Sequence, residues 1–281
     1  MGDSRFIEVN GLKLHYLDYP GDGPTVILTH GLTVNAWTLD PLATRLSPRW
    51  HVIAVDLRGR GLSEKPATGY AMADIAGDIL ALMDHFQLER SFLGGHSSGG
   101  LLTLFMAATY PDRVTHPIML DAGIMHPKVG ELLAPSLARL GKPWPSWENY
   151  LEAVRNGPEL RGWWDPAIED YCRADVEINA DGTVTRRATP AVIAQVIAGQ
   201  SAVNWVNILG GIKQPSLLIN APGAYGPGDT PPMMPRELGQ QTATMLGNCR
   251  YVEVPGNHFT MMYAIGVEAV AQAISDFLEG R

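Results

Sequence analysis

Short apolar runs recur along this chain and alternate with segments of helical periodicity. The runs predict buried strands near residues 25–29, 51–55, 91–95, 116–120, 215–219 and 250–254. Earlier in the chain, Phe6 to Val9 and Leu12 to Tyr16 flank Asn10-Gly11, a pattern that predicts a hairpin. Apolar residues recur at helical spacing in 72–86 and 267–278. This alternation predicts an α/β fold with a mostly parallel central sheet and helices on both faces.

The segment Gly95-His96-Ser97-Ser98-Gly99 lies between one such strand and a helical pattern. A serine on a sharp strand-to-helix turn has a strained backbone and an exposed hydroxyl, and it needs small residues two positions before and after it. Gly95 and Gly99 meet this requirement. Ser97 is therefore our candidate nucleophile, and the alternative is a serine that only caps the helix.

Two further strand ends carry groups that acyl transfer requires. The run 25–29 ends in His30-Gly31-Leu32, where a loop can direct a backbone N–H at a developing oxyanion. We expect the N–H groups of Leu32 and Ser98 to form that oxyanion hole. His258 lies in a loop after the strand near 250–254 and is the candidate general base. Taken alone, His258 could equally be a packed or surface histidine.

Four motifs in this order resemble the α/β-hydrolase superfamily over nearly the whole chain. They are His30-Gly31, the segment from Asp56 to Ser63, the turn at Ser97 and the late loop at His258. The resemblance implies a serine hydrolase with a catalytic triad that works through an acyl-enzyme intermediate and needs no cofactor. Epoxide hydrolases and haloalkane dehalogenases share the scaffold but carry aspartate at the nucleophile position, so Ser97 argues against both.

The alternation of predicted strands and helices is interrupted between about residues 125 and 208. In the superfamily an insertion at this point forms a helical cap, which implies a core of 1–124 and 209–281 with a cap of 125–208. Asp181-Gly182 predicts a turn inside the cap. The cap holds five of the seven tryptophans. We expect most of them to pack a helical layer and one or two to line the substrate pocket; they are Trp144, Trp147, Trp163, Trp164 and Trp205.

The acid of the triad has two candidates at strand ends. Asp229 follows the strand near 215–219, the commoner position in the superfamily, but it lies ten positions beyond Ile219 in a Gly/Pro-rich segment. Asp121 directly follows its strand. Some branches of the superfamily, including polyketide thioesterase domains, take the acid from this earlier strand, and the loop at His258 looks like theirs. We therefore expect Asp121 to be the acid and keep Asp229 as the alternative.

The composition restricts the classes of binding partner. A net charge of −8 disfavours nucleic acid and anionic membrane surfaces, so we expect a small-molecule substrate. Only Cys172 and Cys249 are present, which favours free thiols and a cytoplasmic location. No metal-ligand cluster is evident, and the oligomeric state is not predicted.

These observations favour hydrolysis of a carboxylic ester or lactone. Thioester, amide or carbon–carbon bond hydrolysis on the same scaffold stays open, because these reactions use similar catalytic groups. An alternative of another class is a catalytically silent receptor that holds a small molecule under the cap.

Overall fold

The computed structural model describes residues 2–160 and 162–281, and its centre is an eight-stranded sheet. The strands lie in the order β1-β2-β4-β3-β5-β6-β9-β10; β1 and β2 pair antiparallel, β2 and β4 pair antiparallel, and the other neighbours are parallel. Their bounds are β1 (Asp3–Val9), β2 (Leu12–Tyr19), β3 (Gly23–Thr29), β4 (Trp50–Val55), β5 (Ser91–His96), β6 (Val114–Leu120), β9 (Ser216–Asn220) and β10 (Cys249–Glu253).

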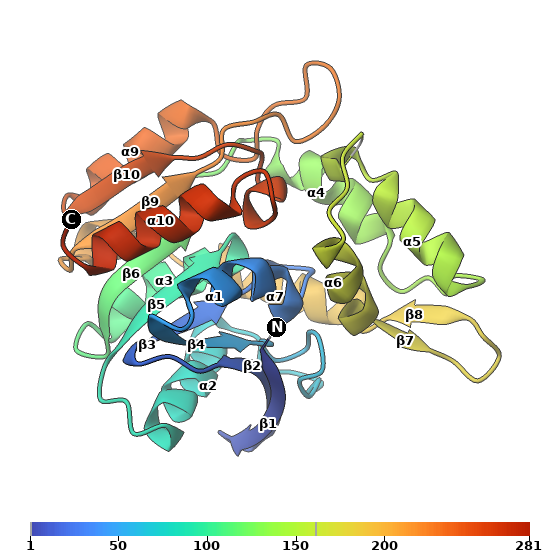
Figure 1. The fold of residues 1–281 in the computed structure, drawn as a ribbon, viewed down its shortest axis with the longest axis horizontal. Helices are drawn as coiled ribbons and strands as arrows, with labels where there is room; N and C mark the ends of the chain where they lie inside the picture. Colours follow the sequence, from blue (N-terminus) through green and yellow to red (C-terminus); the bar gives the residue numbers. More distant parts are fainter. Residues whose placement is uncertain (1, 161) are drawn as a thin grey trace.

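Helices cover both faces of this sheet (Figure 1). One face carries α1 (Asp40–Leu46) and α10 (Val267–Leu278), and the other carries α2 (Met72–His85), α3 (Ser98–Thr109) and α9 (Arg236–Leu246). Short 3₁₀ helices lie at η1 (Ala36–Leu39), η2 (Pro158–Leu160) and η3 (Thr260–Met262). The predicted α/β architecture is confirmed, and so are both predicted helices and the predicted strands, to within two residues except in the hairpin, where β1 begins three residues earlier and β2 ends three residues later than predicted.

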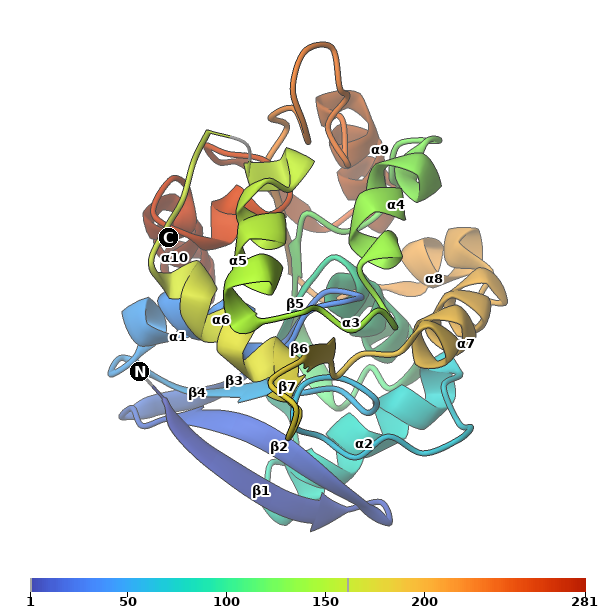
Figure 2. The same ribbon diagram turned by 90° about the vertical axis from the view of Figure 1, so that its right-hand side faces the viewer.

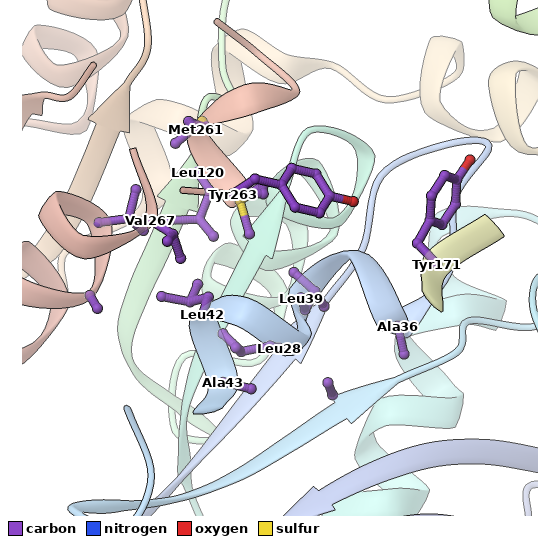
Figure 3. Packing of buried hydrophobic residues seen from close by; sticks show 14 of the residues in the cluster. Leu28, Ala36, Leu39, Leu42, Ala43, Leu120, Tyr171, Met261, Tyr263 and Val267 are labelled. Atoms are coloured by element: carbon purple, nitrogen blue, oxygen red, sulfur yellow. The ribbon is translucent and has the colours of Figure 1, made fainter. Parts of the chain in front are cut away.

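The parallel strands alternate their side chains between two cores. Leu28 points to the core shared with α1 and α10, whereas its neighbour Ile27 points to the core shared with α2 and α3. Figure 3 shows the first core, where Leu28, Leu42 and Val267 pack together. At the N-terminal edge, Asn10 and Gly11 adopt φ of 52° and 73°, as a tight turn between β1 and β2 requires. The hairpin predicted at this point is confirmed.

The segment from 125 to 208 lies over one edge of the sheet and faces the viewer in Figure 2. Its elements are α4 (Val129–Ala138), α5 (Trp147–Arg155), η2, α6 (Ala167–Asp175), β7 (Val176–Ile178), β8 (Val184–Arg186), α7 (Pro190–Ser201) and the start of α8 (Trp205–Gly211). The turn predicted at Asp181-Gly182 joins β7 to β8, and Gly182 adopts φ of 83°. Helix α8 continues past residue 208 and packs on α3 and α9.

No single helix in the described ranges has both the length and the apolar character needed to cross a membrane. By length and composition alone, the bent pair of α7 and α8 could do so.

Candidate active site

Ser97 lies at the sharp turn between β5 and α3. Its backbone has φ of 53° and ψ of −116°, a region that residues other than glycine rarely occupy. The turn is tight enough that a Cβ on Gly95 would lie 2.2 Å from the carbonyl of Gly99, and a Cβ on Gly99 would lie 2.4 Å from the carbonyl oxygen of Thr29. Glycines at these two positions therefore allow the strained serine to project from the sheet.

His258 lies beside Asp121 at the carboxyl ends of the parallel strands. The distance between His258 Nδ1 and Asp121 Oδ2 is 2.6 Å, and both side chains are buried. Because the carboxylate accepts the proton on Nδ1, the lone pair of the neutral ring is on Nε2. Ser97 and His258 line the same cavity, and no hydrogen bond of Ser97 Oγ is present within the described residues. Such bonds are often long before substrate binds.

Two donors orient the Asp121 carboxylate. Its Oδ1 accepts hydrogen bonds from Asn220 Nδ2 at 2.7 Å and from the backbone N–H of Ala221 at 2.9 Å. Asp121 is fully buried, whereas Asp229 is exposed in the loop after β9. The structure thus brings Asp121 to His258, and the described residues include no hydrogen bond between Asp229 and His258.

The N–H groups of Leu32 and Ser98 flank Ser97. Within residues 2–160 and 162–281 neither N–H has a hydrogen-bond acceptor, and both residues line a cavity that reaches Ser97. Ser98 is the first residue of α3, so its N–H is one of the groups that a helix leaves unpaired. Both groups can therefore donate to an oxyanion.

His30 fixes the direction of the Leu32 N–H. The N–H of Leu57 donates to His30 Nε2 at 3.0 Å, so the proton of the ring is on Nδ1 and is donated to the carbonyl of Gly31 at 2.8 Å. The Gly31 carbonyl and the Leu32 N–H point in opposite directions from one planar peptide. The hydrogen bond therefore directs the N–H away from His30. Burial and the nearby Arg60 lower the pKa of His30 to about 4, so the ring is neutral.

The sequence predicted no separate role for Asp56 or His96, which are parts of longer motifs. The structure shows what each of them contacts. Asp56 is fully buried and accepts hydrogen bonds from His15 Nδ1 at 2.7 Å and from the N–H of Ala36 at 2.6 Å, which anchors the loop after β3. His96 Nε2 donates to the carbonyl of His258 at 2.7 Å, and the two rings lie 4.6 Å apart. Burial lowers the pKa of His96 well below its usual value, so a neutral ring packs against His258.

Two chambers meet at Ser97. The first, which we call the apolar chamber, has a volume of about 230 Å³ and contains Ser97, Ser98 and Leu32 in its wall. The rest of its wall is almost entirely apolar and includes Leu101, Met125, Val129, Leu137, Ile197 and Met233. The second has a volume of about 50 Å³, and we call it the polar chamber because His258 and the charged Arg139 and Glu159 line it beside Ser97, Thr33 and Tyr225. The rest of its wall is largely apolar and includes Leu32, Val34, Leu133, Val154, Leu160 and Phe259.

The polar chamber contains an ion pair. Arg139 Nη2 donates to Glu159 Oε1 at 2.7 Å, with 15% and 7% of their side chains exposed. Burial raises the pKa of Tyr225, so its hydroxyl stays protonated. Arg139, Glu159 and Tyr225 carried no motif in the sequence, and only the folded arrangement of α4, η2 and the loop after β9 brings them to His258.

Hydrogen bonds join the segment from 125 to 208 to Ser98 and to Thr33, the residue after Leu32. Gln200 of α7 donates to Ser98 Oγ, and Arg186 donates to the carbonyl of Thr33 at 2.5 Å. Arg186 also pairs with Asp175 at 2.6 Å, and both side chains are 2% exposed. Burial would lower the pKa of Arg186, but the Asp175 carboxylate raises it above its usual value. The guanidinium is therefore charged and holds the loop after β3 in place.

The five tryptophans lie elsewhere. Trp144, Trp147, Trp163 and Trp164 pack against the core shared with α1 and α10, and Trp205 packs against the other core. None of them lines either chamber, so the expectation that one or two would do so is wrong. The described residues contain no group of three or more His, Cys, Asp or Glu side chains arranged to hold a metal ion.

A mostly parallel sheet with helices on both faces, and a strained serine at the end of β5, defines an α/β-hydrolase fold. Residues 24–264 match the alpha/beta hydrolase fold family, and the chain belongs to this family. It is 29% identical to 2-(acetamidomethylene)succinate hydrolase from Mesorhizobium japonicum, over 98% of this chain and 95% of that protein.

Solved structures agree. The crystal structure of E-2-(acetamidomethylene)succinate hydrolase superposes with a TM-score of 0.84 at 26% identity, covering 99% of this chain and 100% of that one. An enol-lactonase from Burkholderia xenovorans LB400 has a TM-score of 0.72 at 21% identity, with 98% and 100% covered, and shares the fold. Of these three similar proteins, the two above 25% identity are both named hydrolases, and they support a hydrolase here.

Proposed function

We propose that this chain is a serine hydrolase that cleaves a carboxylic ester or lactone of a small molecule through an acyl-enzyme intermediate. The observation that carries the proposal is the hydrogen bond of 2.6 Å between Asp121 and His258, which lines the same cavity as the strained Ser97. The roles follow from the chemistry of each group.

In the first half-reaction, His258 Nε2 takes the proton of Ser97 Oγ as that oxygen attacks the substrate carbonyl. The N–H groups of Leu32 and Ser98 stabilise the oxyanion, and Asp121 stabilises the imidazolium. His258 then gives the proton to the leaving oxygen, which breaks the ester bond and leaves the acyl group on Ser97. In the second half-reaction, water attacks this ester with His258 as base, and the acid and free Ser97 are formed.

A second candidate is amide hydrolysis. The relative that is similar over nearly the whole chain is named for a substrate with an acetamido group. The same groups would serve, with the proton from His258 going to a leaving nitrogen. Comparing kcat/KM for an ester and an amide with the same acyl and leaving groups would decide which bond is preferred.

Turnover separates an enzyme from a receptor. The wild-type protein should hydrolyse a generic aryl ester, and Ser97→Ala should lose on the order of 10³-fold or more of that activity while its circular dichroism is unchanged. Binding of small molecules without turnover in either protein would favour the receptor. A cytoplasmic location is part of the proposal and is supported by the free thiols of Cys172 and Cys249.

A further inference from the structure

Resting on this proposed function, we infer that the substrate is an ester of an apolar acyl group, which binds in the apolar chamber, and that the leaving group occupies the polar chamber. The inference assigns a direction to the substrate and a chemical class to its acid half. It depends on which chamber each catalytic group faces.

The reacting carbon has four substituents in the tetrahedral intermediate, and the site fixes three of them. One is Ser97 Oγ, and the second is the oxyanion at the N–H groups of Leu32 and Ser98. The third is the leaving oxygen, which must lie within hydrogen-bond reach of His258 Nε2 to receive its proton. The fourth substituent, the acyl chain, points away from His258.

The walls of the chambers match these directions. His258 lines the polar chamber and is absent from the wall of the apolar chamber. Ser97 and Leu32 line both chambers, and Ser98 lines the apolar chamber but not the polar one. A leaving group that reaches His258 therefore lies in the polar chamber, and the acyl chain enters the apolar one.

Solvation favours the same direction. Arg139 and Glu159 are mostly buried in the polar chamber, so an apolar chain placed against them would remove their remaining contact with water without replacing it. Within the described residues, the wall of the apolar chamber contains no charged residue. In the apolar chamber, by contrast, apolar side chains are in contact with water. Ile197 is 38% exposed, and helix α4, which contributes Val129 and Leu137 to the wall, has no buried residue. An acyl chain in this chamber would remove these partly exposed apolar side chains from water.

Ethyl hexanoate and hexyl acetate test the direction, because they are isomers with the apolar chain on opposite sides of the ester. Each methylene removed fully from water contributes roughly a factor of four. With four methylenes in a chamber that is partly open, we expect kcat/KM to be at least about tenfold higher for ethyl hexanoate. Acid release in a pH-stat measures both rates.

Two matched variants test the chamber. Ile197→Gln places an amide in the wall of the apolar chamber, whereas Val206→Gln makes the same kind of change at a 67% exposed position on α8 that lines neither chamber. Both positions are exposed, so folding should be retained. The measured quantity is the kcat/KM for ethyl hexanoate divided by the kcat/KM for hexyl acetate. This ratio should fall about threefold or more in Ile197→Gln and stay at the wild-type value in Val206→Gln.

Equal rates for the two isomers, faster hydrolysis of hexyl acetate, or an unchanged ratio in Ile197→Gln would overturn the inference and leave ester hydrolysis standing. Failure of the proposed function would look different. In that case the wild-type protein would hydrolyse neither isomer, nor an aryl ester, faster than Ser97→Ala does.

Discussion

Replacing Asp121 by asparagine should reverse the tautomer of His258, because the surroundings of Asp121 fix the orientation of the new amide. Asn220 Nδ2 and the N–H of Ala221 both donate to Oδ1. The amide oxygen of the asparagine must take that position, since the NH₂ group cannot accept either bond. The NH₂ group then faces His258 Nδ1, which becomes the acceptor. The ring proton moves to Nε2, and His258 can no longer take the proton of Ser97.

Removal of the correct tautomer costs about 10⁴-fold in kcat, or about 5 kcal/mol of activation free energy. The substitution keeps the volume, leaves two of the three hydrogen bonds unchanged and reverses the direction of the third, so the fold should survive. The assay is kcat on one aryl ester at several pH values, with circular dichroism as the check on folding. Asp229→Asn is the matched control, because that carboxylate is exposed in the loop after β9.

We expect Asp229→Asn to remain within about tenfold of the parent, allowing for the context dependence of such effects. A large loss of kcat in Asp229→Asn together with a small loss in Asp121→Asn would refute this prediction. It is also refuted if a folded Asp121→Asn protein retains more than about a tenth of the parent kcat.

Three further predictions concern stability. Arg186→Met leaves the buried Asp175 carboxylate without its ion-pair partner, so the melting temperature should fall by about 10 °C. Arg173→Met, the control at an exposed ion pair, should change the melting temperature little. Similar shifts in the two variants would contradict the role of the buried pair. The depressed pKa of His30, about 4, means that the unfolded chain gains a proton as pH falls below about 6.5 while the folded chain does not. The free energy of unfolding should therefore drop by about 3 kcal/mol between pH 7 and pH 4 from this group, and urea titrations of His30→Gln should show a smaller drop. Gly99→Ala should prevent folding or lower the melting temperature sharply, because its Cβ would lie 2.4 Å from a carbonyl oxygen; Gly210→Ala, with nothing within 4 Å, should be neutral or slightly stabilising.

The central sheet and the residues at its strand ends were predictable because their sequence signals are local. Strands of five to eight residues are read from apolar runs, and parallel strands bring their carboxyl ends to one edge of the sheet. Residues directly after those ends, such as Ser97 and Asp121, are therefore neighbours in space although the chain separates them. The glycines around Ser97 carried further information, since the turn leaves no room for a side chain at either position.

The segment from 125 to 208 was not predictable to the same depth. Helix α4 has no buried residue, so its pattern does not show which of its side chains face Ser97. Arg139 and Glu159 are 20 positions apart and meet only through tertiary packing. Aromatic content was misleading, because large side chains such as Trp144 and Trp205 contribute most as packing elements and need not contact a substrate.

The central claim is that Ser97 is the nucleophile, and covalent labelling tests it most directly. The wild-type protein is treated with a serine-directed aryl phosphonate, digested, and mapped by mass spectrometry while the loss of ester hydrolysis is followed. We predict one adduct per chain, on Ser97, that forms in step with inactivation and is absent from Ser97→Ala. An adduct on Ser98 or on any other residue, or complete inactivation with Ser97 unmodified, would contradict the account.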